Sequence, residues 1–287
     1  MFGYCYRRLK VRFIWCVISP KLLREIFGYS GWIFLLAIYQ QIQWESGKLI
    51  LGNTSGTHSV TVYALGVMLA LYYSGLATTI LGMYLPKANQ IASQEGSKNL
   101  SMDVGKQISD YIFTILLPVI IAFYFFGEEF INLWLGPEFE NVYFITIVIM
   151  VLYLPSLMQG FMSSVLEANK KVAIKSIILI SSAIFGMILS YYFSFQHGEY
   201  GILLGLSIGS VISQALLNLY YIKLGYAAYR FYQLTRKQLL LIFALFLTSS
   251  ILYNCIGEGT WILFLIKSGV YAIFILLVIP KYFLAKK

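Results

Sequence analysis

Charged residues are scarce in this chain. Asp, Glu, Lys and Arg make up 11% of its 287 residues, against about 25% in an average soluble domain. With 59% hydrophobic residues and a mean hydropathy of +0.76, the chain has too little polar surface to cover a water-soluble globule. A bundle of helices in a bilayer escapes this requirement because its perimeter faces hydrocarbon. The composition therefore predicts an all-α integral membrane protein.

Sequence signatures of catalysis and of metal binding are missing as well. The chain has no G-x-x-x-x-G-K-[ST] phosphate loop, no H-E-x-x-H or CxxC pair and no clustered carboxylate motif. Its cysteines, Cys5, Cys16 and Cys255, are odd in number and widely spaced, which indicates neither a disulfide framework nor a metal site. We therefore expect no enzyme activity, no cofactor and no metal, and the chain is more typical of a transporter or a structural membrane protein.

Long apolar runs are what the sequence does contain. A helix that crosses about 30 Å of hydrocarbon needs about 20 mostly apolar residues, and such runs predict a bundle of about eight transmembrane helices. They lie near residues 27–51, 59–85, 108–127, 141–166, 174–195, 200–224, 238–256 and 260–282. The loop 86–107 between the second and third runs mixes apolar and polar residues, which predicts a helix–turn–helix lying on the membrane surface.

Positive charge is unevenly placed along these spans. A net charge of +9 on a soluble chain would suggest nucleic-acid binding, but here we expect no nucleic acid and interpret the charge as a topology signal. If every span reverses direction, all of the 21 Lys and Arg residues except Lys48 and Lys267 fall on one face. The other face receives both histidines and Glu128, Glu129, Glu138, Glu140, Glu199 and Glu258. Because Lys and Arg are retained in the cytoplasm, both termini are predicted to be cytoplasmic.

Polar residues inside the spans are the candidate functional residues, because they are costly in hydrocarbon. The second half of the first span is amphipathic, and it is either partly interfacial or lines water or other helices. Glu45 and Lys48 share a helix face and can pair, either as a pair at the outer interface or as part of a cavity. Lys267 has no acidic neighbour in sequence. Small residues between 201 and 213 favour close helix packing.

Short motifs follow one another in a fixed order along the chain. They are SGWIF at 30–34, ESGKLILG at 45–52, YAL at 63–65, LPK at 85–87, FINLWLGP at 130–137 and EANKK at 167–171. In this order they resemble the motifs of polysaccharide repeat-unit flippases, which serve O-antigen and capsule synthesis and belong to the multidrug/oligosaccharidyl-lipid/polysaccharide exporter superfamily. The match covers roughly residues 20–240, and the last two helices match by topology.

The resemblance implies the carboxyl-terminal part of such a flippase, whose members have two six-helix lobes around a central cavity. Residues 1–26 would be a cytoplasmic inter-lobe linker, 27–224 one six-helix lobe, and 225–287 two additional transmembrane helices and a cytoplasmic tail. A separate amino-terminal lobe would then be a partner, besides membrane lipid.

The implied function is the flipping of undecaprenyl-diphosphate-linked oligosaccharides across a bacterial inner membrane, as one step of lipopolysaccharide or other surface polysaccharide synthesis. By the same analogy the first span faces the substrate cavity. The candidate cavity residues are Gln40, Gln41, Gln43, Glu45 and Lys48, with Lys267 as a further one; glutamine amides suit sugar hydroxyls because they both donate and accept hydrogen bonds.

Two alternatives stay open at the level of sequence. One is a multidrug or cation antiporter lobe of the same superfamily, which a carboxylate-rich cavity would favour, whereas the acidic residues here lie mostly in loops. The other is a truncated membrane protein without transport activity.

Overall fold

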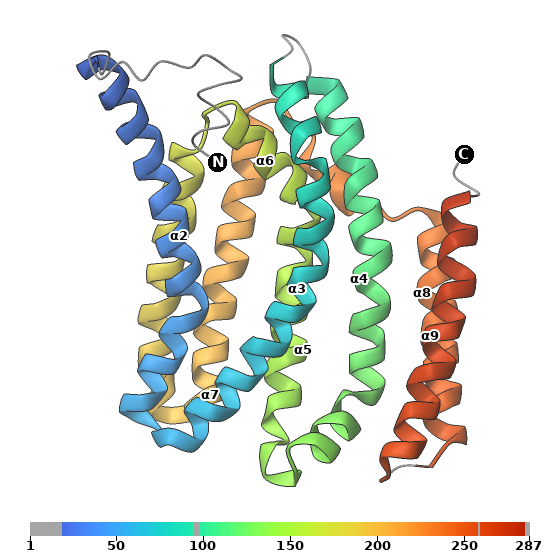
Figure 1. Cartoon of the computed structure of the whole chain (residues 1–287). Helices are drawn as coiled ribbons and strands as arrows, with labels where there is room; N and C mark the ends of the chain where they lie inside the picture. The colour runs from blue at the N-terminus through green and yellow to red at the C-terminus, as the bar shows by residue number, and fades with distance from the viewer. Residues whose placement is uncertain (1–18, 94–97, 258, 285–287) are drawn as a thin grey trace, which may run out of the picture.

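The chain folds into a bundle of long helices that lie side by side (Figure 1). The computed structural model describes residues 19–93, 98–257 and 259–284, and the regular elements in these ranges are all helical. The all-α prediction is confirmed. The elements are α2 (Pro20–Thr54), α3 (Gly56–Ala92), α4 (Lys98–Trp134), a 3-10 turn η1 (Pro137–Phe139), α5 (Asn141–Met158), α6 (Gly160–Ala168), α7 (Ala173–Lys223), a second 3-10 turn η2 (Ala228–Tyr232), α8 (Arg236–Cys255) and α9 (Trp261–Leu284).

Six segments in the described ranges are long and apolar enough to cross a membrane, which makes the chain a multi-pass membrane protein. They lie in α3, α4, α5, α7, α8 and α9. Helix α2 has 35 residues and is long enough, but the polar residues of its second half lower its hydropathy. The first span was expected to be the weakest for this reason.

Helix α7 contains two of the expected spans, because it doubles back at Gly198. This residue has a φ of +53°, a conformation that glycine adopts without the steric cost of a Cβ atom. The hydroxyl of Ser190 donates to the carbonyl oxygen of Ile202 at 3.0 Å, although a straight helix would hold residues 12 apart in sequence about 18 Å from each other. The first arm (173–197) and the second arm (199–223) therefore form an antiparallel hairpin.

Small residues hold these two arms together. A Cβ atom added to Gly209 would lie 2.9 Å from the Cα atom of Gly186 and 2.9 Å from the carbonyl oxygen of Ser182. The expected close packing of the small residues between 201 and 213 is confirmed, and it lets the two backbones come within contact distance.

Basic residues gather at the end of the bundle where α3 finishes and α4, α7 and α8 begin, here called the basic end. Lys98 donates to the carbonyl oxygen of Leu224 at 2.9 Å, and Arg230 pairs with Asp103 at 3.2 Å. The start of α2 and the end of α9 lie at this end too (Figure 1). The opposite, acidic end carries Glu199, whose carboxylate accepts a 2.9 Å hydrogen bond from Asn141.

The segment 86–107 is helical on both sides of residues 94–97, as predicted, but its helices are not separate ones that lie on the membrane surface. Helix α3 continues through Pro86 to Ala92, and α4 begins at Lys98, so both helices simply extend beyond their spans. The reason is that the apolar residues of this segment, such as Ile91 and Met102, are buried in the main core rather than turned to the membrane surface. Helix α2 likewise begins at Pro20, inside the range expected to be a linker, and residues 1–18 lie outside the described ranges.

Helices α8 and α9 pack on one side of the bundle, against α4. Their own small core joins Leu241, Leu245 and Tyr271 to Ile121 and Phe126 of α4, apart from the main core of α2 to α7. This separation agrees with a six-helix lobe followed by two further helices, a division that stays a prediction.

The hairpin of α7 gives a test of the packing. Replacing Gly209 by Ala should lower the free energy of unfolding by about 1–3 kcal/mol, because the new methyl group overlaps the first arm. Thermal unfolding of the purified chain in detergent would measure it. Gly75→Ala is the matched control, since a Cβ atom there meets no neighbour within 4 Å. Equal melting temperatures for the two variants would contradict the close approach of the arms.

Candidate functional site

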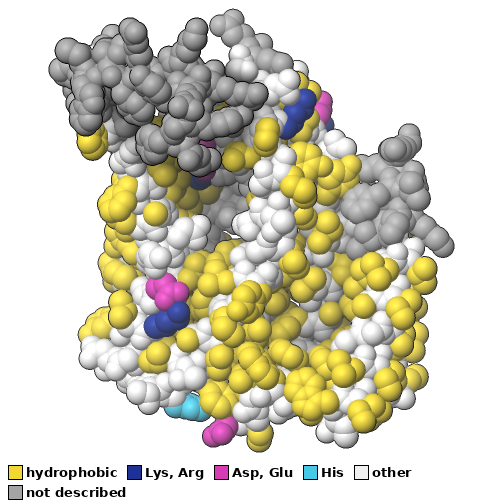
Figure 2. Space-filling model, viewed as in Figure 1, with side chains coloured by type: hydrophobic (Ala, Val, Ile, Leu, Met, Phe, Trp, Pro, Cys, Tyr) yellow, Lys and Arg dark blue, Asp and Glu magenta, His cyan; other side chains and the backbone are white. Residues whose placement is uncertain are grey.

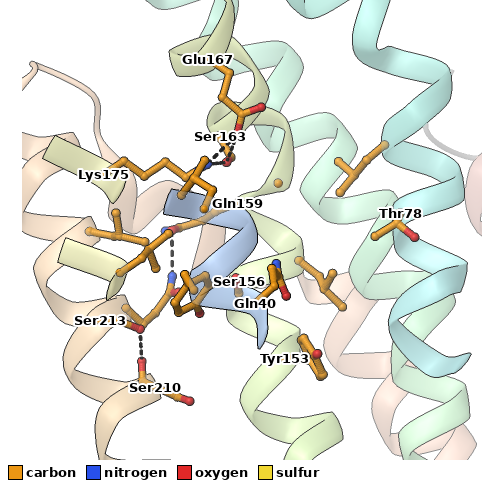
Figure 3. Close-up of a pocket in the computed structure, with 18 of the residues that line it drawn as sticks. Gln40, Thr78, Tyr153, Ser156, Gln159, Ser163, Glu167, Lys175, Ser210 and Ser213 are labelled. Atoms are coloured by element: carbon orange, nitrogen blue, oxygen red, sulfur yellow. Dashed lines mark hydrogen bonds and ion pairs between the residues drawn. The ribbon is translucent and has the colours of Figure 1, made fainter. Parts of the chain in front are cut away.

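A cavity of about 490 Å³ lies inside the bundle, between α2, α3, α5, α6 and both arms of α7 (Figure 3). Its volume is within the range of about 300–1,000 Å³ that is typical of ligand sites. Its lining mixes apolar, aromatic and polar side chains: Ile33, Leu36, Ala37, Tyr39, Gln40, Trp44, Thr78, Leu81, Leu152, Tyr153, Ser156, Leu157, Gln159, Gly160, Ser163, Glu167, Lys175, Leu179, Ser210, Ser213, Gln214, Leu217 and Tyr221.

A buried cation lies at the basic end of the cavity. Lys175, in the first turn of α7, is 7% exposed, and its Nζ is 2.7 Å from the Oε1 of Glu167. It also donates to the hydroxyl of Ser163 (Figure 3). Glu167 and Ser163 both belong to α6, so this short helix places the partners of Lys175. The lysine is buried while the side chain of Glu167 is 35% exposed; a buried charge needs further hydrogen bonds, and the hydroxyl of Ser163 accepts one from Lys175.

Amide side chains form the next part of the wall. Gln159 lies at the break between α5 and α6 and is 3% exposed. Its Oε1 accepts a 2.8 Å hydrogen bond from Gln214, and its own Nε2 donates to Asn218 at 2.5 Å. Both of these partners lie on the second arm of α7. The amides thus cross-link the two helical walls with hydrogen-bonding groups.

Aromatic rings complete the wall towards the acidic end. Trp44 of α2 and Tyr153 of α5 lie with their ring centroids 4.8 Å apart, and both line the cavity. Aromatic side chains offer large contact area with a polar group at one end. Together with the amides, they make a wall suited to a ligand that has both hydroxyl groups and apolar faces.

The sequence pattern shared by the family described as polysaccharide biosynthesis protein matches residues 1–144, which is just over half of the chain. The chain belongs to this family. No curated protein and no solved structure matches it. Family membership together with the apolar spans supports a transporter that serves polysaccharide biosynthesis, in agreement with the resemblance to repeat-unit flippases. The matched residues include α2, α3 and α4, whereas α6 and α7 lie beyond them.

Two of the predicted site residues in this polysaccharide biosynthesis protein lie at or beside the cavity. Gln40 lines it, on the same stripe of α2 as Ile33, Ala37 and Trp44. Gln43 is 1% exposed and donates to the hydroxyl of Ser210 at 2.7 Å, which ties α2 to the second arm of α7.

Three other predicted residues form a different stripe of the same helix. Gln41 is exposed, and the side chains of Glu45 and Lys48 are 42% and 32% exposed while their charged groups pair at 2.7 Å. In Figure 2 an acidic and a basic side chain lie together on the otherwise apolar face over α2. The expected pairing of Glu45 with Lys48 is confirmed. Their place in a substrate cavity stays a prediction.

Lys267 lies outside the cavity, at the junction of α9 with α4. It is fully buried, its Nζ is 2.8 Å from the Oε2 of Glu129, and the ring of Tyr253 lies 5.9 Å from it. Its partner was missed because Glu129 was placed in an outside loop and lies 138 residues away in sequence. Helix α4 in fact continues to Trp134, so Glu129 belongs to a helix.

Sequence reasoning missed several residues of the cavity wall. Lys175 was counted among the basic residues that set topology, although the structure buries it. Gln159 and Gln214 carried a usable signal, because both are amides inside apolar spans, where polar side chains are costly and tend to be functional.

The junction between α9 and α4 gives a second test. Lys267→Met should lower the free energy of unfolding by about 3–5 kcal/mol, because it leaves the carboxylate of Glu129 buried without its partner. The double variant Lys267→Met with Glu129→Met should recover most of that loss. Thermal unfolding in detergent measures both, and a double variant as unstable as the single one would show that the ion pair is not what holds the junction.

Proposed function

We propose that this chain moves undecaprenyl-diphosphate-linked oligosaccharide repeat units from the cytoplasmic to the periplasmic leaflet of a bacterial inner membrane. The observation that carries the proposal is one cavity with a buried lysine at its basic end and amide and aromatic side chains along the rest of its wall. Family membership supports the link to polysaccharide biosynthesis.

Each part of the proposed substrate has a matching region of the protein. The diphosphate would bind the ammonium group of Lys175, which pairs with Glu167 in the structure. A diphosphate competes well with a single carboxylate for this ammonium group because it carries more negative charge. Sugar hydroxyls would bind the amides of Gln40, Gln159 and Gln214, which donate and accept hydrogen bonds. The polyprenyl tail can stay in the hydrocarbon around the bundle.

The orientation of the bundle in the membrane follows from its two ends. Lys and Arg are retained on the cytoplasmic side of membrane proteins, so we assign the basic end to the cytoplasm. Lys175 then lies near the leaflet from which the substrate enters. The start of α2 and the end of α9 fall on the cytoplasmic side in this orientation.

A separate amino-terminal lobe is the proposed partner of this chain. The stripe of Gln41, Glu45 and Lys48 is exposed on the surface of a helix that lies in an apolar bundle. Ion pairs facing lipid are costly, so we infer that this stripe faces water or packs against the second lobe. Translocation forms and breaks no covalent bond, and the proposal assigns no catalytic residue.

An antiporter lobe is less well supported. Among the described residues that line the cavity, Glu167 is the one carboxylate, and it is paired with Lys175. A cavity that exchanges cations would need carboxylates left free to bind them.

The test is restoration of surface polysaccharide. The chain would be expressed with a six-helix amino-terminal half of a repeat-unit flippase in bacteria that lack their own flippase. Lys175→Gln should lower periplasmic glycan by about 10- to 100-fold, because one hydrogen bond to a charged group contributes about 1.5–3 kcal/mol. Lys171→Gln is the matched control, since Lys171 is exposed at the same end. Equal glycan levels in the two variants would refute a diphosphate site at Lys175.

A pair of neighbouring glutamines tests which face of α2 meets the sugar. Gln40→Ala should lower glycan delivery by about 2- to 10-fold, the range expected for one lost hydrogen bond, because Gln40 lines the cavity. Gln41→Ala, one residue along on the exposed stripe, should leave delivery unchanged. Equal losses in the two variants would instead extend the substrate path to the stripe of Gln41, Glu45 and Lys48. Membrane levels of both variants are measured by immunoblot.

A further inference from the structure

Tyr232 extends the amide wall of the cavity into the connection between α7 and α8. This residue ends η2, and its hydroxyl accepts a 2.8 Å hydrogen bond from the Nε2 of Gln214. The amide of Asn218 lies 3.4 Å from the same hydroxyl. With the bonds from Gln214 to Gln159 and from Gln159 to Asn218, these four side chains close a ring, here called the amide ring.

The amide ring joins two residues that line the cavity to two that lie behind its wall. Gln159 and Gln214 are part of the cavity wall, whereas Asn218 and Tyr232 hold them from the far side. An amide can present either its oxygen or its NH₂ group to a ligand, and its hydrogen-bond partners decide which. In a low-dielectric interior such bonds are strong, so the partners hold that orientation firmly.

The position of Tyr232 is itself set by α4. Phe231, the residue before Tyr232, packs its ring against Gly105. A Cβ atom added to Gly105 would lie 3.1 Å from the Cε1 atom of that ring. Gln233, the residue after Tyr232, is held through its carbonyl oxygen, which accepts a 2.6 Å hydrogen bond from the ammonium group of Lys106. The connection is therefore pinned at both neighbours of Tyr232.

The start of α8 is held by the same helix. Thr235 and Gln238 form a capping box at the first turn of α8, and the Nε2 of Gln238 donates to the carboxylate of Asp110 at 3.2 Å. A chain of polar contacts thus runs from α8 through the connection to the cavity wall.

We propose that Tyr232 is a positioning residue of the cavity, which orients the amides of Gln159 and Gln214 for the sugar part of the substrate. The connection between α7 and α8 is then part of the binding site, and the two last helices act on the cavity through it. The sugar as ligand rests on the proposed function above; the control of the cavity wall by Tyr232 does not.

The variant Tyr232→Phe tests this assignment, because it removes one hydroxyl and keeps the ring. Tyr229→Phe is the matched control in the same 3-10 helix, where the side chain is 62% exposed. The first measurement needs no substrate. A chain with Cys5, Cys16 and Cys255 changed to Ser would carry Ser213→Cys, a buried position in the cavity wall next to Gln214, and its reaction with a small maleimide would be timed.

The labelling rate should rise about 2- to 10-fold with Tyr232→Phe. Maleimide reaches Ser213→Cys when the wall opens locally, and losing one net hydrogen bond makes that opening easier by about this factor. It should not change with Tyr229→Phe. Equal labelling rates in all three proteins would overturn the assignment, whatever the substrate is.

The second measurement uses two probes on the purified full chain in complex with the amino-terminal half used above: undecaprenyl diphosphate, and the same lipid carrying a neutral disaccharide. Tyr232→Phe should raise the Kd of the disaccharide probe about 2- to 10-fold and leave that of the bare lipid unchanged, a split that a general loss of folding would not produce. An unchanged Kd for the disaccharide probe in a variant with faster labelling would also overturn the assignment. If the unaltered complex binds neither probe more tightly than undecaprenol, the proposed function fails, and the labelling rate alone decides the role of Tyr232.

Discussion

Buried polar side chains are costly in this bundle, and several of the longest of them are satisfied by a partner on another helix. An unsatisfied polar group in hydrocarbon costs several kcal/mol, so these pairs specify which helices lie side by side. Gln43 ties α2 to the second arm of α7 through Ser210, and Lys267 ties α9 to α4 through Glu129. The same requirement shapes the cavity, because the buried ammonium group of Lys175 is paired with the half-buried carboxylate of Glu167.

Close backbone packing provides the frame for these polar contacts. The arms of α7 approach each other through Gly186 and Gly209, without side chains between them. Their antiparallel course brings Lys175 of the first arm and Gln214 of the second arm into the wall of one cavity. A cation and an amide that lie far apart in sequence can then meet the same ligand, which a single straight helix could not arrange.

The two last helices are linked to the cavity wall as well as to the side of the bundle. They pack against α4 and have their own small core, yet the connection before them enters the amide ring through Tyr232. A transporter built in this way can hold the amides of its cavity wall from outside the bundle that forms the cavity. The proposed positioning role of Tyr232 also gives a reason for the close attachment of the connection between α7 and α8 to α4.

The sequence by itself determined the fold class, the positions of most spans, the close packing of the small residues between 201 and 213 and the separation of basic from acidic ends. These features depend on hydropathy, residue size and charge, which are properties of short segments and survive in any packing. Only the tertiary structure decided that Lys267 pairs with Glu129, that Lys175 is buried, and that Gln40 rather than Gln41 lines the cavity. Neighbouring residues on a helix point about 100° apart, and residues distant in sequence can be paired by any of several packings. Which polar groups meet was therefore settled by the rotation and contact of whole helices.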